Sequence, residues 1–454
     1  MKAEIFRAYD IRGIYPDDID ESGVFCVAQN FVKILQQEKP DKTLKIAVGR
    51  DMRVSSPKLH ASAVKGVVSM GAEVVDIGLA STPTFYFAVA QNGYDGGLEI
   101  SASHNPKEYN GIKIVREEAQ SIGLANGLDK IRDACVVNGE HKPQGEGKIE
   151  KKEDVLAERV KYALSFYDFS KIKPLKVVAD PANAMGAPDL EALFAKLPCE
   201  LVKMNFKLDG TFPVHEADPF KMENVADLRQ KVVAEKADLG IATDGDADRI
   251  FFIDNRGEFV EPAIIRGLMA QEALKHSPGA KVGYDIRPGM ITREMIEGAG
   301  GKPFVTKVGH SLIKQHSRKE KAVFSGESSG HFFFQTKFGF FETPLIVALV
   351  ILKEISESGK SLAELIKPYQ KYFHSGEINS EVEDKETKMK ELEKKFGQGA
   401  KNVSWLDGIT VEHKDWWFNV RPSNTEPKLR LNLEARDAKL MEKWRDKVLE
   451  VIRS

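Results

Sequence analysis

GLEISASHNP (residues 97–106) is the stretch around which the rest of the chain is arranged. Its first four residues predict a short apolar strand, which the Ser-Ala-Ser-His-Asn-Pro run cannot continue. Asn105-Pro106 predicts a turn, so Ser103 and His104 are expected at the strand's end. In open α/β sheets, functional sites lie beyond the carboxyl ends of the strands. Ser103 is therefore expected at a position where it can act as a nucleophile. Taken alone, the stretch also fits an ordinary turn whose hydroxyl satisfies backbone groups.

The same arrangement recurs along the chain. An apolar strand that ends at an aspartate is followed, roughly 40–65 residues later, by a short apolar segment that breaks into a polar loop. The strands are KIAVGRD (45–51), KVVAD (176–180) and KVGYD (281–285). The loops are SASHNP (101–106), TDGDADR (243–249) and GESSGH (326–331). Such recurrence indicates that one structural unit has been duplicated.

The fold class follows from this pattern, because strands that alternate with helices predict parallel sheets. We predict three similar α/β domains with mixed, mostly parallel sheets and a smaller C-terminal α+β domain, around a central cleft. The last region breaks the repeat, with a charged helix over 385–396, two strands over 416–435 and an amphipathic helix over 441–453. Polar linkers and turns place the domains at 1–148, 149–255, 256–368 and 369–454.

The bulk properties exclude several classes of protein. A formal charge of −2 over 454 residues argues against a non-specific nucleic-acid binder, which would be strongly basic. The N-terminus has no apolar signal-peptide region, and PLIVALVIL (344–352) is too short to span a bilayer. Three cysteines without a CxxC pair fit a reducing compartment. We therefore expect a cytoplasmic protein with no nucleic-acid or membrane partner.

The second loop predicts a metal site. Asp244, Asp246 and Asp248 alternate between two apolar strands, and carboxylates this close repel one another unless a cation is present. Oxygen ligands alone suit Mg²⁺ or Mn²⁺. A calcium EF-hand is excluded because Arg249 stands where that loop needs glycine, Asn255 where it needs glutamate, and the flanks are strands. The remaining alternative is a solvated acidic turn.

The third and fourth loops predict ligand-binding groups. GESSGH also fits the nucleophile elbow of α/β-hydrolases, but the aromatic, Gly-interrupted run over 331–341 is not the helix that an elbow needs. Glu327, Ser329 and His331 instead resemble hydrogen-bonding groups for a polyhydroxylated ligand. RPSNTEP (421–427) combines a guanidinium, hydroxyls, an amide and backbone N–H groups, which suit a phosphate, although a plain hairpin loop is equally compatible.

Taken together, SASHNP, DGDADR, GESSGH and RPSNTEP resemble, in this order and spacing, the four signature loops of the α-D-phosphohexomutases. RAYDIRG (7–13) and KVGHS (307–311) are similar to the phosphomannomutase/phosphoglucomutase branch of that family. The resemblance covers the whole chain. It implies interconversion of hexose 6-phosphate and hexose 1-phosphate, of mannose and/or glucose, through a phosphoserine and a hexose 1,6-bisphosphate that also serves as activator.

The resemblance also implies a set of site residues. Ser103 would carry the phosphoryl group and, with the three aspartates, hold one Mg²⁺ per chain. His104, Lys113 and Arg249 would complete the catalytic group, with Lys113 as a candidate base. The expected substrate-binding residues are Tyr9, Arg12, Arg287, His310, Glu327, Ser329, His331, Arg421, Ser423, Asn424 and Thr425.

The expected partner is a small phosphosugar, and the enzyme is expected to be a monomer. Two alternatives stay open at this point. One is a phosphoglucosamine mutase, which shares the family, and the other is a non-catalytic phosphosugar-binding protein with the same cleft.

Overall fold

The computed structural model describes residues 1–137, 139–423 and 427–454. The contacts among them divide the chain into two compact units. The first unit contains Met1–Val260 and Ser329–Leu365, and the second contains Glu261–Ser328 and Ile366–Ser454. Asn424 and Thr425, both expected in the phosphate-binding loop, lie outside the described residues.

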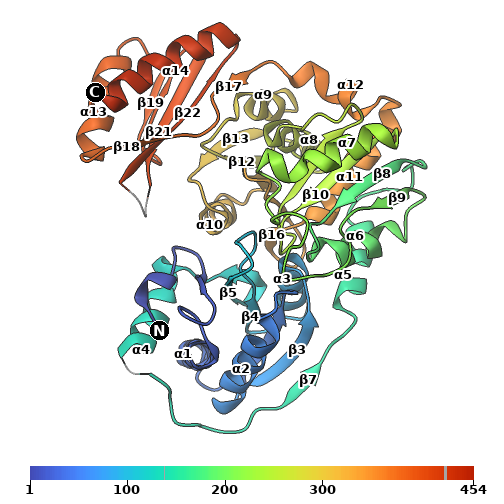
Figure 1. Ribbon diagram of the computed structural model, residues 1–454, viewed down its shortest axis with the longest axis vertical. Helices are drawn as coiled ribbons and strands as arrows, with labels where there is room; N and C mark the ends of the chain where they lie inside the picture. The colour runs from blue at the N-terminus through green and yellow to red at the C-terminus, as the bar shows by residue number, and fades with distance from the viewer. Residues whose placement is uncertain (138, 424–426) are drawn as a thin grey trace. The chain divides into compact units, whose positions relative to one another are not determined.

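A mixed sheet forms the N-terminal part of the first unit (Figure 1). Its strands are β1 (Ile11–Ile14), β2 (Lys45–Arg50), β3 (Glu73–Leu79), β4 (Gly96–Ile100), β5 (Tyr109–Arg116), β6 (Gln120–Ser121) and β7 (Ile149–Lys151). They run in the order β1-β5-β4-β2-β3-β7, with β6 beside β5. β2 is parallel to β3 and β4, whereas β5 is antiparallel to β4 and β1. The serine loop therefore leaves the middle of this sheet.

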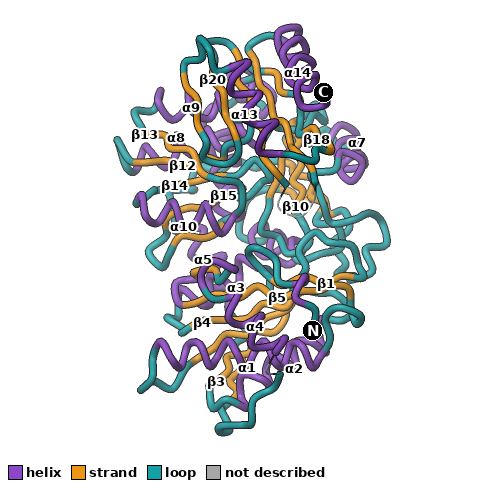
Figure 2. The backbone as a smooth tube through the Cα atoms, turned by 90° about the vertical axis from the view of Figure 1, so that its left-hand side faces the viewer, coloured by secondary structure: helices purple, strands orange, loops and turns teal. Residues whose placement is uncertain are grey.

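Helices cover both faces of this sheet because successive strand residues point to opposite sides. The helices are α1 (Glu21–Glu38), α2 (Ser56–Ser69), α3 (Thr82–Gln91) and α4 (Leu128–Val137). Ile46 and Val48 of β2 pack in one apolar cluster with α1, α2 and α4, while Ala47 between them packs with α3 on the other face. Figure 2 shows α1 and α2 side by side, in purple, below β4 and β5.

The middle part of the first unit repeats the pattern on a smaller scale. Its strands are β8 (Lys176–Asp180), β9 (Glu200–Lys203), β10 (Leu239–Thr243) and β11 (Ile250–Asp254), and its helices are α5 (Val155–Leu164), α6 (Gly186–Phe194) and α7 (Ala226–Ala234). The order is β11-β10-β8-β9, parallel except for the antiparallel pair β10–β11. The aspartate loop joins that last pair.

Residues 261–366 contain the third set of strands and helices. Its strands are β12 (Lys281–Asp285), β13 (Lys302–Thr306), β14 (Phe324–Gly326), β15 (Phe332–Gln335) and β16 (Phe340–Glu342). Its helices are α8 (Pro262–His276), α9 (Met290–Gly298), α10 (His310–Glu320), α11 (Pro344–Ser358) and α12 (Leu362–Ile366). β12 is parallel to both β13 and β14, and β15 and β16 form an antiparallel hairpin.

The C-terminal part is an antiparallel sheet with helices packed on it. Its strands are β17 (Phe373–His374), β18 (Ile378–Glu381), β19 (Asn402–Ser404), β20 (Ile409–Glu412), β21 (Trp416–Pro422) and β22 (Lys428–Ala435), and its helices are α13 (Lys385–Phe396) and α14 (Ala438–Arg453). The order is β17-β22-β21-β20-β19, with β18 also on β22. The stacked rings of Trp416 and Trp444, with centroids 4.2 Å apart, join α14 to this sheet.

The predicted fold class is confirmed: three α/β parts with mixed, mostly parallel sheets precede a smaller α+β part. The domain boundaries and the central cleft stay predictions. The apolar run over 344–352 lies within α11 and is buried on all sides, as expected for a core helix. Among the described residues, no helix combines the length and the apolar composition that crossing a membrane requires.

His215 supplies a test of how the first unit responds to pH. Its Nε2 lies 3.1 Å from Oδ2 of Asp180 and its Nδ1 lies 2.9 Å from the backbone oxygen of Glu216, so both ring nitrogens face acceptors. Burial opposes the charge, but the hydrogen bond to Asp180 prevails and raises the pKa of His215. A raised pKa gives stability that is complete below the unfolded value of about 6.5 and is lost as the pH rises through the folded value.

We therefore expect His215→Asn to lower the free energy of unfolding by about 1.5–3 kcal/mol at low pH, because a hydrogen bond to a charged group is lost. The difference from the parent protein should shrink as the pH rises above about 6.5. Urea unfolding at pH 6 and pH 9 measures both values. A gap that is equal at the two pH values would show that His215 is not charged in the folded protein.

Candidate active site

The serine loop follows β4 and is held by a buried arginine. Ser103 is 1% exposed and has a φ of 51°, in the left-handed region that strains a residue with a Cβ. Arg53, fully buried, donates to the backbone oxygens of Ser103 at 2.8 Å and Asn105 at 2.6 Å. It also donates to those of Pro106 at 2.7 Å and Tyr109 at 3.0 Å. These bonds fix the loop in the conformation that orients the Ser103 hydroxyl.

Arg12 lies beside the same loop. It stands on β1, and its Nε donates to Oδ2 of Asp10 at 2.8 Å, while its Nη1 donates to Oδ1 of Asn105 at 2.5 Å. Burial opposes its charge, but Asp10 prevails and raises the pKa of Arg12. Tyr9 precedes β1 and is half-buried. The RAYDIRG segment thus brings a fixed cation to the serine loop, as expected for a group that binds an anion.

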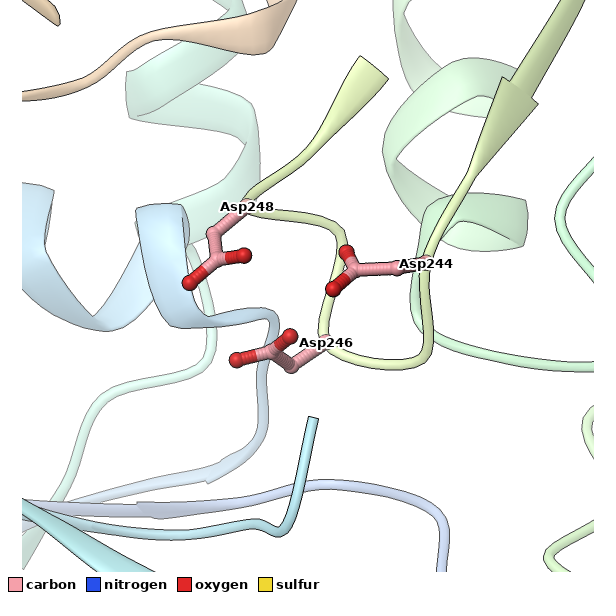
Figure 3. A group of neighbouring side chains, drawn as sticks. All are labelled: Asp244, Asp246 and Asp248. Atoms are coloured by element: carbon pink, nitrogen blue, oxygen red, sulfur yellow. The ribbon is translucent and has the colours of Figure 1, made fainter. Parts of the chain in front are cut away.

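The three aspartates converge on one point from the loop between β10 and β11 (Figure 3). All three are buried, and one carboxylate oxygen from each lies within 4.8 Å of the others. Gly245 lets this loop approach the serine loop, because a Cβ there would lie 2.3 Å from the Ser103 backbone oxygen. The hydroxyl of Ser103 donates to Oδ2 of Asp244 at 3.0 Å. The nucleophile and the acidic group therefore form one site.

Lys113 balances part of the negative charge. It projects from β5, and its Nζ donates to Oδ2 of Asp246 and, at 2.6 Å, to Oδ2 of Asp248. Burial opposes its charge, but the two carboxylates raise the pKa of Lys113 well above its ordinary value. In the same way Lys113 lowers the pKa of Asp246, and with His331 it lowers that of Asp248 strongly, both against burial. Lys113 therefore keeps its proton in this arrangement.

Among the described residues, no lysine contacts Asp244 in this way. Burial, together with the charges of Asp246 and Asp248, raises the pKa of Asp244 well above its ordinary value. In addition, Oδ1 of Asp246 is buried without a hydrogen-bond partner among the described residues. Closely spaced carboxylate oxygens, one of them without a hydrogen-bond partner, are ligands that suit a hard divalent cation. The group can therefore hold a metal ion.

His104 and Arg249 stand over the Ser103 hydroxyl. An Nη2 of Arg249 donates to Nδ1 of His104 at 2.8 Å, and the Ser103 Oγ lies 3.2 Å from the same nitrogen. Because arginine can only donate, Nδ1 of His104 is an acceptor. Burial, reinforced by the charge of Arg249, lowers the pKa of His104 well below its ordinary value. His104 is thus a neutral acceptor within reach of the nucleophile.

Ser329 and His331 reach the aspartate loop from the third set of strands. Nε2 of His331 lies 3.1 Å from Oδ1 of Asp248, and Nδ1 of His331 lies 3.1 Å from the Ser329 hydroxyl. Backbone pairing supports these contacts, since the Ile250 N–H donates to the oxygen of Gly330 at 3.1 Å. Both residues therefore stand at the acidic group, where a bound ligand would meet them.

The second unit carries its own group of expected residues. Arg287 follows β12; its Nε donates to Oδ2 of Asp285 at 2.6 Å, and its Nη2 lies 3.0 Å from Oε1 of Glu327. The same Glu327 oxygen accepts from the Gly309 N–H at 3.0 Å, directly before His310, the first residue of α10. Burial opposes the charge of Arg287, but Asp285 and Glu327 raise its pKa. Arg287, Glu327 and the His310 turn are therefore placed together.

The hydrolase alternative fails on the surroundings of Ser328. Its backbone N–H and its hydroxyl both donate to Oδ1 of Asp285 at 2.9 Å, and Nη1 of Arg266 donates to the hydroxyl at 3.1 Å. β15 follows rather than a helix. A nucleophile elbow requires a serine hydroxyl that is free to attack and a helix directly after it. The Ser328 hydroxyl is engaged by Asp285 and Arg266, and a strand follows it.

Part of the fourth loop lies within the described residues. Arg421 is 9% exposed, and its Nη2 donates to Oε2 of Glu377 at 2.6 Å. Burial opposes the charge of Glu377, but Arg421 prevails and lowers its pKa. Nη2 of Arg430 donates to the Ser423 hydroxyl at 3.4 Å. Arg421, Ser423 and Arg430 thus give this loop two guanidinium groups and a hydroxyl, a set suited to phosphate.

Glu434 ties the C-terminal sheet to the segment that carries Arg287. Its Oε2 accepts from the N–H groups of Gly289 at 3.2 Å and Met290 at 3.1 Å, at the start of α9, and from Nε1 of Trp417 at 2.8 Å. Burial raises the pKa of Glu434. A carboxylate at a helix N-terminus satisfies N–H groups that have no partner within the helix.

Glu434→Gln should therefore lower the free energy of unfolding by about 1–3 kcal/mol, because one strong acceptor for three buried donors is weakened. Urea unfolding measures the change, with Glu442→Gln on the exposed face of α14 as the matched control. Equal stability of the two variants would contradict this role for Glu434.

Comparison with known proteins agrees with the geometry. Family descriptions of phosphoglucomutase/phosphomannomutase match in order: alpha/beta/alpha domains I, II and III over residues 3–136, 156–257 and 262–372, and the C-terminal domain over 377–451. A protein of Xanthomonas campestris named "Phosphohexose mutases" is 38% identical over 456 residues and covers all of both chains. A "Phosphomannomutase" of Escherichia coli is 36% identical over 450 residues, 97% of each chain.

A solved structure leads to the same family. The phosphoglucomutase/phosphomannomutase family protein of Burkholderia thailandensis superposes with a TM-score of 0.89 at 29% identity, covering 99% of this chain and 97% of that one. The matches extend from the serine loop to the C-terminal sheet, and the relatives are matched over nearly their full length. The chain belongs to the phosphoglucomutase/phosphomannomutase family.

Proposed function

We propose that the chain interconverts hexose 6-phosphate and hexose 1-phosphate, of mannose and/or glucose, through a phosphoryl group carried on Ser103. The observation that supports this most strongly is the hydrogen bond of 3.0 Å between the Ser103 hydroxyl and Asp244 within a group of three buried carboxylates. A buried serine, a cation-binding group and a neutral histidine in one place suit phosphoryl transfer, which depends on positioning and on neutralising charge.

The residues of the first unit divide this work. Arg249 and Arg12 offset the negative charge on the oxygens of the transferring phosphoryl group. The hydrogen bonds that Arg53 donates to backbone oxygens of the loop hold Ser103 in position. His104 accepts a hydrogen bond from Arg249 and lies 3.2 Å from Ser103 Oγ, so it holds that guanidinium beside the serine hydroxyl. Lys113 is protonated here and acts as a cation. It would act as a base only after losing that proton.

Mg²⁺ is the cation that we propose for Asp244, Asp246, Asp248 and the phosphorylated Ser103. The donor set is oxygen only, which Mg²⁺ prefers. When bound, the ion would offset negative charge on the phosphoryl oxygens. One ion per chain matches one group of three aspartates.

The remaining expected residues bind the sugar phosphate. Glu327 and Ser329 accept and donate hydrogen bonds to sugar hydroxyls, and Tyr9, His310 and His331 also bind the substrate. Arg287 and the Arg421–Ser423 loop, together with Asn424 and Thr425, hold the phosphate that does not react. If the hexose 1,6-bisphosphate intermediate leaves before it turns over, Ser103 loses its phosphoryl group, so free bisphosphate serves as activator by returning that group to Ser103.

The test is a coupled assay of the purified chain with Mg²⁺ and a hexose 1,6-bisphosphate. It compares kcat/KM for mannose 1-phosphate, glucose 1-phosphate and glucosamine 6-phosphate. The proposal expects the highest value for mannose or glucose. A preference for the glucosamine ester would favour a phosphoglucosamine mutase, and phosphosugar binding without turnover would favour a non-catalytic binding protein. Monomeric state and cytoplasmic location stay predictions.

A further inference from the structure

Two cysteines far apart in the sequence meet in the core of the N-terminal sheet. Cys26 stands on α1 and Cys135 on α4, 109 residues apart, and their Sγ atoms are 2.9 Å from each other. They are 5% and 8% exposed, and both are free thiols. The separation is within about 1 Å of an S–S bond length of about 2.05 Å. The two helices therefore hold the thiols almost at bonding distance.

The surroundings keep the pair in this position. The Cys26 thiol also donates to the backbone oxygen of Gly139 at 3.2 Å. Asn30 anchors the pair from α1: its Nδ2 donates to the backbone oxygen of Cys26 at 2.9 Å and lies 3.4 Å and 3.5 Å from the two sulfurs. These contacts involve neither Ser103 nor the aspartate group, so the phosphoryl-transfer proposal gives the pair no role.

We propose that Cys26 and Cys135 are a redox-reactive pair that closes into an intramolecular disulfide when a hydroperoxide supplies the oxidising equivalents. The sulfur of Cys26 attacks the peroxide oxygen, the O–O bond breaks, and a sulfenic acid and one water form with hydrogen peroxide as the oxidant. The sulfur of Cys135 then attacks that of Cys26, the S–O bond breaks, and the hydroxide leaves with the Cys135 proton as a second water. Two thiols are oxidised, and one peroxide is reduced to two waters.

The two thiols differ in a way that assigns these steps. When Cys26 is ionised, it accepts hydrogen bonds from Cys135 and Asn30 in place of donating its own, which lowers the pKa of Cys26; the same pairing and burial raise the pKa of Cys135. The thiolate is the nucleophile toward peroxide, so Cys26 reacts first and Cys135 resolves it. The resulting bond closes a loop of about 110 residues and restricts the unfolded chain, so the oxidised protein should be the more stable form.

The test starts with the reduced full-length chain. It is treated with an equimolar amount of hydrogen peroxide, quenched with catalase, unfolded in iodoacetamide and analysed by intact mass and peptide mapping. The proposal expects one alkylated cysteine, Cys199, and a cross-linked Cys26–Cys135 peptide that dithiothreitol releases. It also expects Tm to rise by about 5 °C or more on oxidation. Three alkylated cysteines, or oxidation to sulfinic acid without a cross-link, would overturn it.

Variants identify the pair. Cys199→Ser removes the half-buried cysteine and should keep the cross-link and the rise in Tm. Cys135→Ser should lose both and leave a sulfenic acid on Cys26. Cys135→Ala repeats that measurement without burying a hydroxyl, in case the serine variant folds poorly. A cross-link that persists in Cys135→Ala, or that disappears in Cys199→Ser, would contradict the assignment.

Discussion

Ser103→Ala is expected to lower kcat for the mutase reaction by about 10⁴-fold or more, because losing a covalent nucleophile removes the step that all later steps need. Ser103 is 1% exposed, and its hydroxyl lies beside Asp244 and His104, where the proposed transfer takes place. The backbone bonds from Arg53 do not depend on the side chain, so the variant should fold. The coupled assay and a thermal melt measure the two effects.

Ser328→Ala is the matched control, since this serine belongs to the only motif that suggested a different nucleophile. Its hydroxyl donates to Asp285, so the substitution should cost far less activity than Ser103→Ala does. The hydrolase alternative expects the reverse order. A Ser103→Ala enzyme with full activity would contradict the proposed mechanism outright.

Asp244→Asn is expected to separate activity from stability. Activity should fall by about 10³-fold, because one of the three aspartates among the proposed cation ligands loses its charge while the geometry stays. The metal-free protein should melt at the same temperature or higher, because burial and two neighbouring carboxylates already disfavour the charge on Asp244. Asparagine retains an oxygen that accepts from Ser103. Thermal melts in a chelator and the coupled assay measure the two effects.

The change in melting temperature on adding Mg²⁺ gives a second test of Asp244. A ligand that binds only the folded state stabilises it by mass action, so the parent protein should melt higher with Mg²⁺ than in a chelator. Asp244→Asn should show a smaller rise at the same concentration. Activity of the parent should vanish in the chelator and return with Mg²⁺. Equal Mg²⁺ shifts in the two proteins would remove Asp244 from the proposed metal site.

Elements with a clear apolar pattern could be predicted from the sequence. The helices expected over 385–396 and 441–453 occur as α13 and within α14, and the strand expected over 45–51 occurs as β2. Each of the two helices has one apolar face, and β2 is buried along most of its length. Local signals therefore sufficed for the fold class and for the position of the serine and aspartate loops.

β5 (Tyr109–Arg116) was not predicted as a strand. Its sequence, YNGIKIVR, carries a glycine, an asparagine and a lysine at positions that are buried in the sheet. Such residues are not typical of a core strand. Lys113 can be buried there because its Nζ contacts two carboxylates more than 130 residues away. The family resemblance pointed to Lys113, whereas the hydrophobic periodicity of this segment did not predict a strand.

Residues that act through distant partners were missed altogether. Arg53 binds a loop 50 residues further on, Glu377 binds Arg421 44 residues away, and Glu434 binds the start of α9 across 145 residues. A long-range polar contact has no characteristic spacing in the sequence, because the fold rather than the local sequence brings its partners together. Such partners become visible only once the strands are placed.

Transfer of a labelled phosphoryl group tests the central claim most directly. The purified chain is loaded from an isotopically labelled hexose 1,6-bisphosphate, freed of excess label, digested and mapped, and a second portion is mixed with unlabelled mannose 1-phosphate before quenching. We predict that the label is found on Ser103 and passes to the sugar within one turnover when Mg²⁺ is present. Label on another residue, or label that stays on Ser103 while mutase turnover continues, would contradict the account.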